Sequence, residues 1–169
     1  MEQQELEQQL QELRQGKLSH DETYHMVATF GKQHYLEAHP DIERLLGHEN
    51  AELRNIALVV LGFDWHREEH WETALHMLQH DPDDNNRLTA ASVLGTLKVN
   101  TGDRLVLQAL AQVVHNAHED LFVRKAAYFA MKAILHYDYV EQRASLRKPF
   151  EPEQDVDWEL VNSYLYALC

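Results

Sequence analysis

Three segments of the chain carry one pattern at a spacing of about one helical hairpin. Each segment begins with an arginine, has an alanine three residues later, and has a large apolar residue seven residues later. The segments are 54–62, 87–95 and 124–132. Their arginines are 33 and 37 residues apart, which leaves room for two helices of about a dozen residues with their turns. Because one such hairpin cannot bury its apolar stripe alone, the repeat predicts a stack of helical hairpins.

The residues before each arginine predict the rest of the hairpin. Asn50, Asp83 and Asp120 each lie four residues before an arginine. A short side chain in this place accepts the unpaired N–H groups at a helix N-terminus, so a second helix begins here. Upstream of each cap, apolar residues recur at the spacing of one helix face, which predicts a first helix. These apolar residues are Ile42, Leu45 and Leu46, then Trp71, Ala74, Leu75 and Leu78, then Leu107, Leu110, Val113 and Val114.

The ends of the chain predict further helices around the repeats. Ser19 and Glu22 form a capping box, and Gly16 ends the helix before it. The predicted fold class is all-α, an α-solenoid of about three helical hairpins with helical caps at its N- and C-terminal ends. We predict one domain over 1–169, made of an N-terminal cap (1–39), three repeats (40–142), a proline-containing linker (143–155) and a C-terminal helix (156–169). That last helix either caps its own solenoid or docks on another chain.

The repeated pattern resembles HEAT-like repeats, which also occur in phycobilin lyases. The resemblance covers roughly residues 40–136, and it departs from the pattern where Lys132 replaces the glycine found at Gly62 and Gly95. It implies that the second helices line a concave surface that binds a partner. The residues that it assigns to this surface are Asn55, Val59, Phe63, Ser92, Thr96, Lys125, Phe129 and Lys132. We predict Val59 and Phe129 as anchors; the alternative is that both pack on a neighbouring helix.

The charge of the chain restricts its partners. The net charge is −13, and acidic residues outnumber basic ones in every part of the sequence. A field of this sign repels nucleic acids and anionic membranes, so we predict a neutral or basic protein partner. No apolar run is long enough to span a bilayer. Cys169 is the only cysteine, which predicts a reducing, cytoplasmic setting.

Histidines around residue 70 are the strongest hint of chemistry. The segment His66–His70 fits the H-x-x-E-H pattern of one class of zinc peptidases. If residues 66–80 form one continuous helix, His66, His70, His76 and His80 share about a third of its circumference. These four are weak candidate metal ligands, and a peptidase site would also need a third protein ligand and a substrate cleft. We predict that they form a pH-responsive, solvent-facing surface with no metal and no cofactor.

No catalytic constellation can be assembled from the remaining residues. The glycines are scattered, so there is no phosphate-binding loop, and the single cysteine is terminal. We predict that Arg54, Arg87 and Arg124 tie adjacent hairpins together through Asp or Asn side chains. The predicted function is a non-catalytic protein–protein interaction module, either an adaptor or an immunity-type inhibitor. The alternative is a lyase-like or metal-binding accessory subunit of an enzyme.

Overall fold

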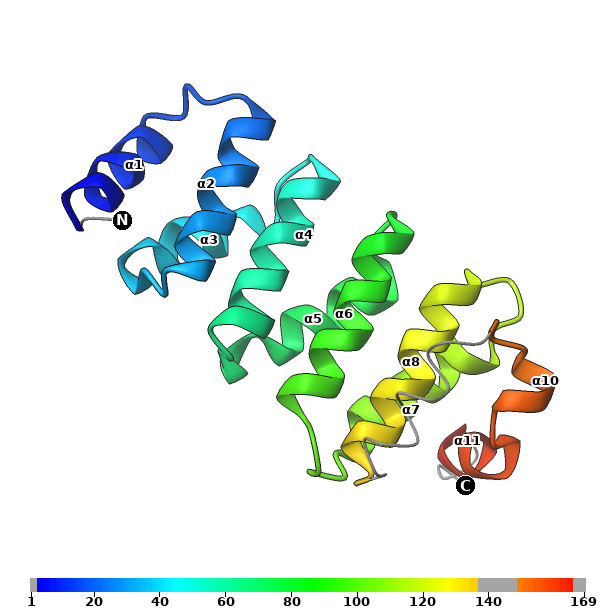
Figure 1. Cartoon of the computed structure of the whole chain (residues 1–169). Coiled ribbons are helices and arrows are strands. Elements are labelled where there is room, and N and C mark those ends of the chain that lie inside the picture. The colour runs from blue at the N-terminus through cyan, green and yellow to red at the C-terminus, as the bar shows by residue number, and fades with distance from the viewer. Residues whose placement is uncertain (1–2, 137–148, 166–169) are drawn as a thin grey trace. The chain divides into compact units, whose positions relative to one another are not determined.

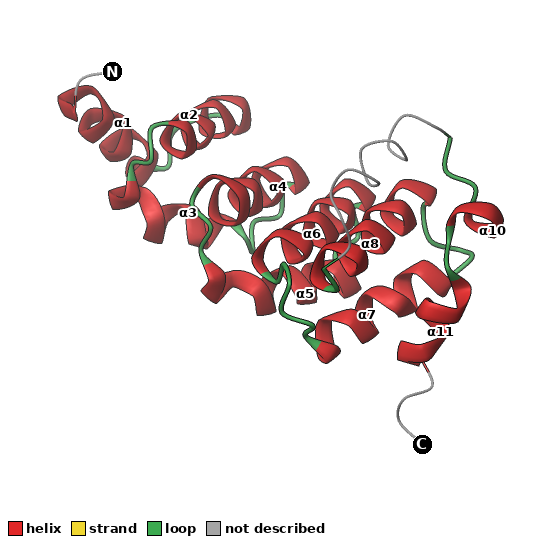
Figure 2. Ribbon diagram, turned by 60° about the horizontal axis from the view of Figure 1, so that its bottom comes forward, coloured by secondary structure: helices red, strands yellow, loops and turns green. Residues whose placement is uncertain are grey.

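The computed structural model describes residues 3–136 and 149–165 of the chain (Figure 1). Within these residues the secondary structure is helical and contains no strand (Figure 2). The predicted all-α fold is therefore confirmed. Residue contacts divide the chain into two compact units, Met1–His70 and Trp71–Cys169. The prediction of one domain with a cap, three repeats, a linker and a last helix stays a prediction.

The first unit consists of two helical hairpins and a short terminal segment. The first hairpin is α1 (Gln3–Gln15) with α2 (His20–Lys32). The second is α3 (His39–Leu45), preceded by the 3-10 turn η1 (Leu36–Ala38), with α4 (Ala51–Val59). Helix α4 continues directly into one π-helical turn, η2 (Val60–Asp64), and a 3-10 turn, η3 (Glu68–His70), ends the unit.

The predicted N-terminal cap contains a hairpin of the same kind as the repeats. Ser19 caps α2 through the expected capping box, and Phe30, eleven residues later, is fully buried. Asn50 and Leu61 have the same spacing and the same two roles in the next hairpin. Thr23 occupies the position of the repeat arginine. The two helices were predicted, but their likeness to the repeats was not, because the repeat was defined by its arginines.

The second unit contains two further hairpins and the C-terminal helices. The hairpins are α5 (Trp71–His80) with α6 (Asp84–Leu97), and α7 (Arg104–His115) with α8 (Leu121–Ile134). The second helices α6 and α8 lie side by side (Figures 1 and 2). They approach closely at Gly95, which has no side chain. A Cβ atom added there would lie only 2.9 Å from the Cα atom of Ala130. The glycine of the repeat pattern thus lies at a close contact between two second helices.

The C-terminal part packs on the second hairpin of this unit. Helix α10 (Pro152–Asp155) lies inside the predicted linker, where Phe150 and Pro152 are both buried. Helix α11 (Trp158–Leu165) contacts α7, and its Val161 is fully buried. The rest of the predicted linker before Pro149 and the end of the predicted C-terminal helix, residues 166–169, lie outside the described residues. Helix α11 therefore covers its own unit.

The three predicted N-caps are confirmed. Asn50, Asp83 and Asp120 each accept a hydrogen bond from a backbone N–H in the first turn of α4, α6 and α8. The Asp120 carboxylate accepts two, from Phe122 N at 2.8 Å and Val123 N at 3.2 Å. These bonds mark where each second helix begins.

Removal of the Asp120 cap should destabilise the protein measurably. We expect Asp120→Ala to lower the free energy of unfolding by about 1 kcal/mol, because two N–H groups lose their acceptor. Asp84→Ala is the matched control, since Asp84 is an exposed residue in the first turn of α6 rather than its cap. Urea denaturation followed by circular dichroism measures both. Equal effects of the two changes would contradict a specific cap.

The repeat arginines bind the ends of the first helices. Arg54 Nη1 donates to the carbonyl oxygens of His48 and Glu49, and Arg124 Nε donates to Val114 O. Arg87 Nη1 donates in the same way to Asp81 O at 2.9 Å. Arg87 also forms a two-pronged pair with Glu119. The predicted tie between adjacent hairpins is present at Arg87, through a glutamate rather than the expected Asp or Asn. The bonds of Arg54 and Arg124 described above stay within their own hairpins and go to carbonyl oxygens.

Candidate functional site

Five of the eight predicted partner-binding residues lie on the neighbouring helices α6 and α8. Each of them is partly exposed. The Ser92 hydroxyl donates to Leu88 O at 3.0 Å, and the Thr96 hydroxyl donates to Ser92 O at 3.1 Å, so both are bonded within α6. We call the five residues the α6–α8 surface: Ser92, Thr96, Lys125, Phe129 and Lys132.

Helix α8 extends this surface by a residue that the sequence analysis did not select. Phe122 is 66% exposed, more than any other exposed large apolar residue of the described chain. It precedes Lys125, Phe129 and Lys132 by three, seven and ten residues, which is the spacing of one helix face. The repeat pattern begins at Arg124, so Phe122 was not selected, although its helical spacing from Phe129 was visible in the sequence. Helix α8 therefore alternates aromatic and cationic groups along one stripe.

The two lysines of this stripe lie over aromatic rings. Lys125 Nζ is 6.0 Å from the centre of the Phe129 ring, and Lys132 Nζ is 5.8 Å from the centre of the Tyr128 ring. Cations at this distance are attracted by the ring quadrupole, which restrains both partners. Although the chain carries a net charge of −13, both charged members of the α6–α8 surface are cations.

The other three predicted residues lie in the first unit. Asn55 and Val59 are on α4 and Phe63 is in η2, and all three are partly exposed. Val59 packs against the hydrophobic core of this unit. Part of its side chain therefore packs on its neighbours, as in the alternative prediction. Phe63 lies within a π-helical turn, where the rotation per residue differs from that of an α-helix. Its direction could therefore not be extrapolated from the α-helical pattern.

The predicted solvent-facing surface of four histidines is wrong, because residues 66–80 do not form one continuous helix and His70 is buried. His66 has a positive φ of 50°, η3 ends at His70, and α5 begins only at Trp71. His66 is consequently exposed in a turn, whereas the rings of His76 and His80 lie on α5 with centroids 4.7 Å apart. The four histidines do not share one helix face.

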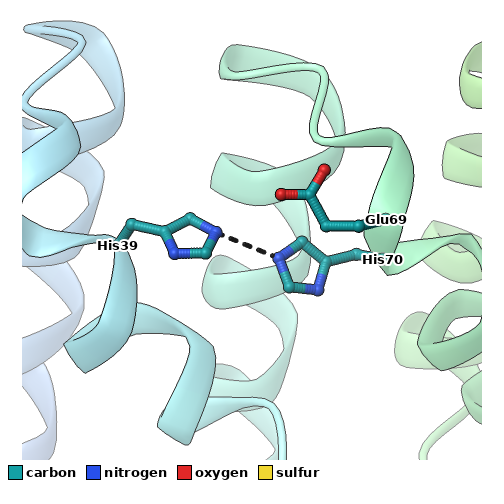
Figure 3. Close-up of side chains that lie close together, drawn as sticks. All are labelled: His39, Glu69 and His70. Carbon is teal, nitrogen blue, oxygen red and sulfur yellow. Dashed lines mark hydrogen bonds between the residues drawn. The ribbon is translucent and has the colours of Figure 1, made fainter.

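His70 instead faces a histidine from the start of α3. Its Nε2 atom lies 3.2 Å from the Nε2 atom of His39, and the Glu69 carboxylate lies beside the pair (Figure 3). The ligand atoms of His39, Glu69 and His70 all lie within 4.8 Å of one another. Among the described residues this is the one such group of His, Cys, Asp and Glu side chains. The sequence analysis selected His70 but missed His39.

Burial and hydrogen bonds set the charges of this group. His70 is only 4% exposed, and this desolvation lowers the pKa of its imidazole, which favours the neutral form. Glu69 has a lowered pKa, first because of a backbone hydrogen bond and also because Arg67 donates to it. Arg67 Nε lies 2.8 Å from Glu69 Oε1. The group thus combines two imidazoles with an ionised carboxylate.

Comparison with known proteins identifies the repeat. A family model of HEAT repeats matches residues 38–132, which is more than half of the chain. The chain belongs to the HEAT repeat family. No curated protein matches this HEAT repeat protein. Its fold is therefore α-solenoid-like, and HEAT repeats in general mediate protein–protein interaction.

The matched segment runs from the start of α3 almost to the end of α8. The hairpin of α1 and α2 precedes this segment, yet it has the same caps and buried positions as the repeats. No helix in the described part of this HEAT repeat protein is both long and apolar enough to cross a membrane.

Proposed function

We propose that this HEAT repeat protein is a non-catalytic adaptor or immunity-type inhibitor that binds a neutral or basic protein on the α6–α8 surface and Phe122. The observation that carries the proposal is the stripe on α8, in which exposed Phe122 and partly exposed Phe129 alternate with two lysines. Aromatic groups supply most of the binding energy at protein interfaces, and large exposed aromatic side chains mark such surfaces. We also propose a cytoplasmic setting, in keeping with the single cysteine.

Charge acts on the proposed complex at two distances. The net charge of −13 attracts a basic partner from afar and raises the rate of encounter. At the stripe itself, Lys125 and Lys132 disfavour a cation in direct contact. The partner that fits best therefore places apolar groups against Phe122 and Phe129 and carries its basic residues at the margin of the contact.

Mutation of the stripe should abolish partner binding without unfolding the protein. We expect Phe129→Asp or Phe122→Asp to weaken binding by about 100-fold, because a buried aromatic anchor contributes at least about 2 kcal/mol. The partner is captured from native lysate with the wild-type protein, identified by mass spectrometry, and titrated in pure form. Phe122→Asp is the safer variant for folding, since that ring is already largely exposed.

Leu105→Asp is the matched control for this titration. Leu105 is 57% exposed on α7, the first helix of the hairpin, and is not part of the stripe. It should leave binding unchanged. Full affinity of both phenylalanine variants, or a loss caused only by Leu105→Asp, would refute the proposed surface. Weaker capture at high salt would support a basic partner.

A metal-binding accessory role is the second candidate function. It is favoured by one observation, the meeting of His39, Glu69 and His70 in the first unit (Figure 3). A lyase-like role has no comparable support from the described residues.

A further inference from the structure

We propose that His39, Glu69 and His70 form a binding site for a divalent transition-metal ion of the Zn²⁺ type. The two histidine Nε2 atoms are 3.2 Å apart. Two nitrogen ligands at about 2.0–2.1 Å from one tetrahedral Zn²⁺ ion are themselves separated by about 3.3 Å. The imidazoles therefore already have the spacing that a shared ion requires, with little movement of either ring.

The third group completes a recognised type of ligand set. The Glu69 carboxylate belongs to the group whose ligand atoms lie within 4.8 Å of one another, and its side chain is exposed. Two imidazoles and one carboxylate suit zinc and related ions, whereas Mg²⁺ and Ca²⁺ prefer oxygen ligands throughout. Because Glu69 lies on the solvent side, water can supply a fourth ligand. Glu69 and His70 thus keep their places in the H-x-x-E-H pattern, while His39 takes the place of His66.

The surrounding fold holds the two imidazoles in position. The His39 ring stacks on Trp65, with centroids 6.1 Å apart and planes inclined by 26°. Trp65 is itself fixed, because its Nε1 donates to Gly31 O at 3.3 Å. The π-helical turn η2 and the left-handed residue His66 then return the chain so that buried His70 faces His39. Ligands restrained in this way lose little freedom on binding an ion.

Two contacts compete with the metal. In its absence one neutral imidazole donates its Nε2–H to the other, and Arg67 Nη2 lies 2.6 Å from Glu69 Oε1. When both rings carry their proton on Nδ1, both Nε2 atoms have a free lone pair, and each can bind the ion in place of the other ring. The carboxylate has two oxygens and about four lone-pair directions, so it can accept Arg67 and still bind an ion. Arg67 nevertheless places a positive charge beside the site and weakens cation binding.

Calorimetric titration of the full chain with Zn²⁺, after treatment with a chelator and at pH 7.5, tests the site. We expect one equivalent of tight binding, reduced at least about 100-fold by His39→Ala and clearly by Glu69→Gln. Arg67→Ala should tighten binding by about threefold to tenfold, because it removes a neighbouring cation. Co²⁺ in place of Zn²⁺ should give the visible absorption of a four-coordinate ion with nitrogen ligands, and His39→Ala should abolish it.

The double variant His76→Ala/His80→Ala is the control. These adjacent rings on α5 are another close histidine pair, with centroids 4.7 Å apart, and their removal should leave the tight site intact. The proposal is overturned if no equivalent binds tightly, or if binding survives His39→Ala and disappears in the double variant. The titration needs no partner protein, so its failure is distinguishable from a failure of the interaction proposed for the second unit.

Discussion

Replacement of Gly95 by alanine should lower the free energy of unfolding by about 2 kcal/mol, even though the same change in an ordinary helix raises it by about 1 kcal/mol. The added Cβ atom would lie 2.9 Å from Ala130 Cα and 3.0 Å from Ala130 Cβ. Backbone cannot rotate away as a long side chain can, so α6 and α8 must separate. Fully buried Leu94 and Met131 would then lose part of their contacts.

Gly47→Ala is the control for this prediction. A Cβ atom on Gly47 meets nothing within 4 Å, and the residue has no positive φ. Its replacement should leave stability unchanged or raise it slightly. Urea denaturation followed by circular dichroism compares the two variants. If Gly95→Ala stabilised the protein as Gly47→Ala does, α6 and α8 would not be in the close contact described.

Replacement of Arg87 by methionine should cost about 2–3 kcal/mol of stability, the largest effect that we expect from a single charged residue. Arg87 Nε and Nη2 donate to the two carboxylate oxygens of Glu119 at 3.0 and 2.7 Å. The two side chains are only 19% and 12% exposed. The hydrogen bonds with Glu119 raise the pKa of Arg87 above its ordinary value, so the guanidinium keeps its charge. Methionine retains the apolar stem but leaves a largely buried carboxylate without its cation.

A double-mutant cycle with Glu119→Gln isolates the energy of this pair. We expect the two changes together to cost clearly less than the sum of the single changes. Arg44→Met is the matched control, because Arg44 also forms an ion pair, with Asp41 at 3.2 Å, but is 77% exposed. That change should have little effect, as is usual for surface ion pairs. Additive effects of Arg87→Met and Glu119→Gln would show that the contact contributes nothing of its own.

The hairpins were predictable because their signals are local. A capping side chain, an apolar stripe and a small residue act within one helix or on the helix next to it, so Asn50, Asp83 and Asp120 could be placed without knowledge of the fold. The N-terminal helices were predicted, but their likeness to the repeats was missed because Thr23 replaces the arginine, although Ser19 and Phe30 keep the underlying spacing. The arginine therefore occurs in fewer hairpins of this chain than the capping residue and the buried apolar residue do.

The candidate partner surface was predictable only in part. Lys125, Phe129 and Lys132 could be selected because α8 is a regular helix, and each is partly exposed as expected. Val59 was harder to judge, because whether it contacts the core depends on how α4 packs on its neighbours. Phe63 lies beyond the start of a π-helical turn that no sequence pattern indicated.

The sequence by itself determined the helices, their caps and the repeat, because each depends on the spacing of a few residues along one element. Tertiary structure alone decided which histidines meet. His66 and His70 are only four residues apart in sequence, but His66 has a left-handed backbone and the 3-10 turn η3 follows it, so the two do not share a helix face. His39 lies 31 residues before His70, and α3 brings the two imidazoles to 3.2 Å. Such a contact depends on the packing of separate elements, which helical periodicity does not specify.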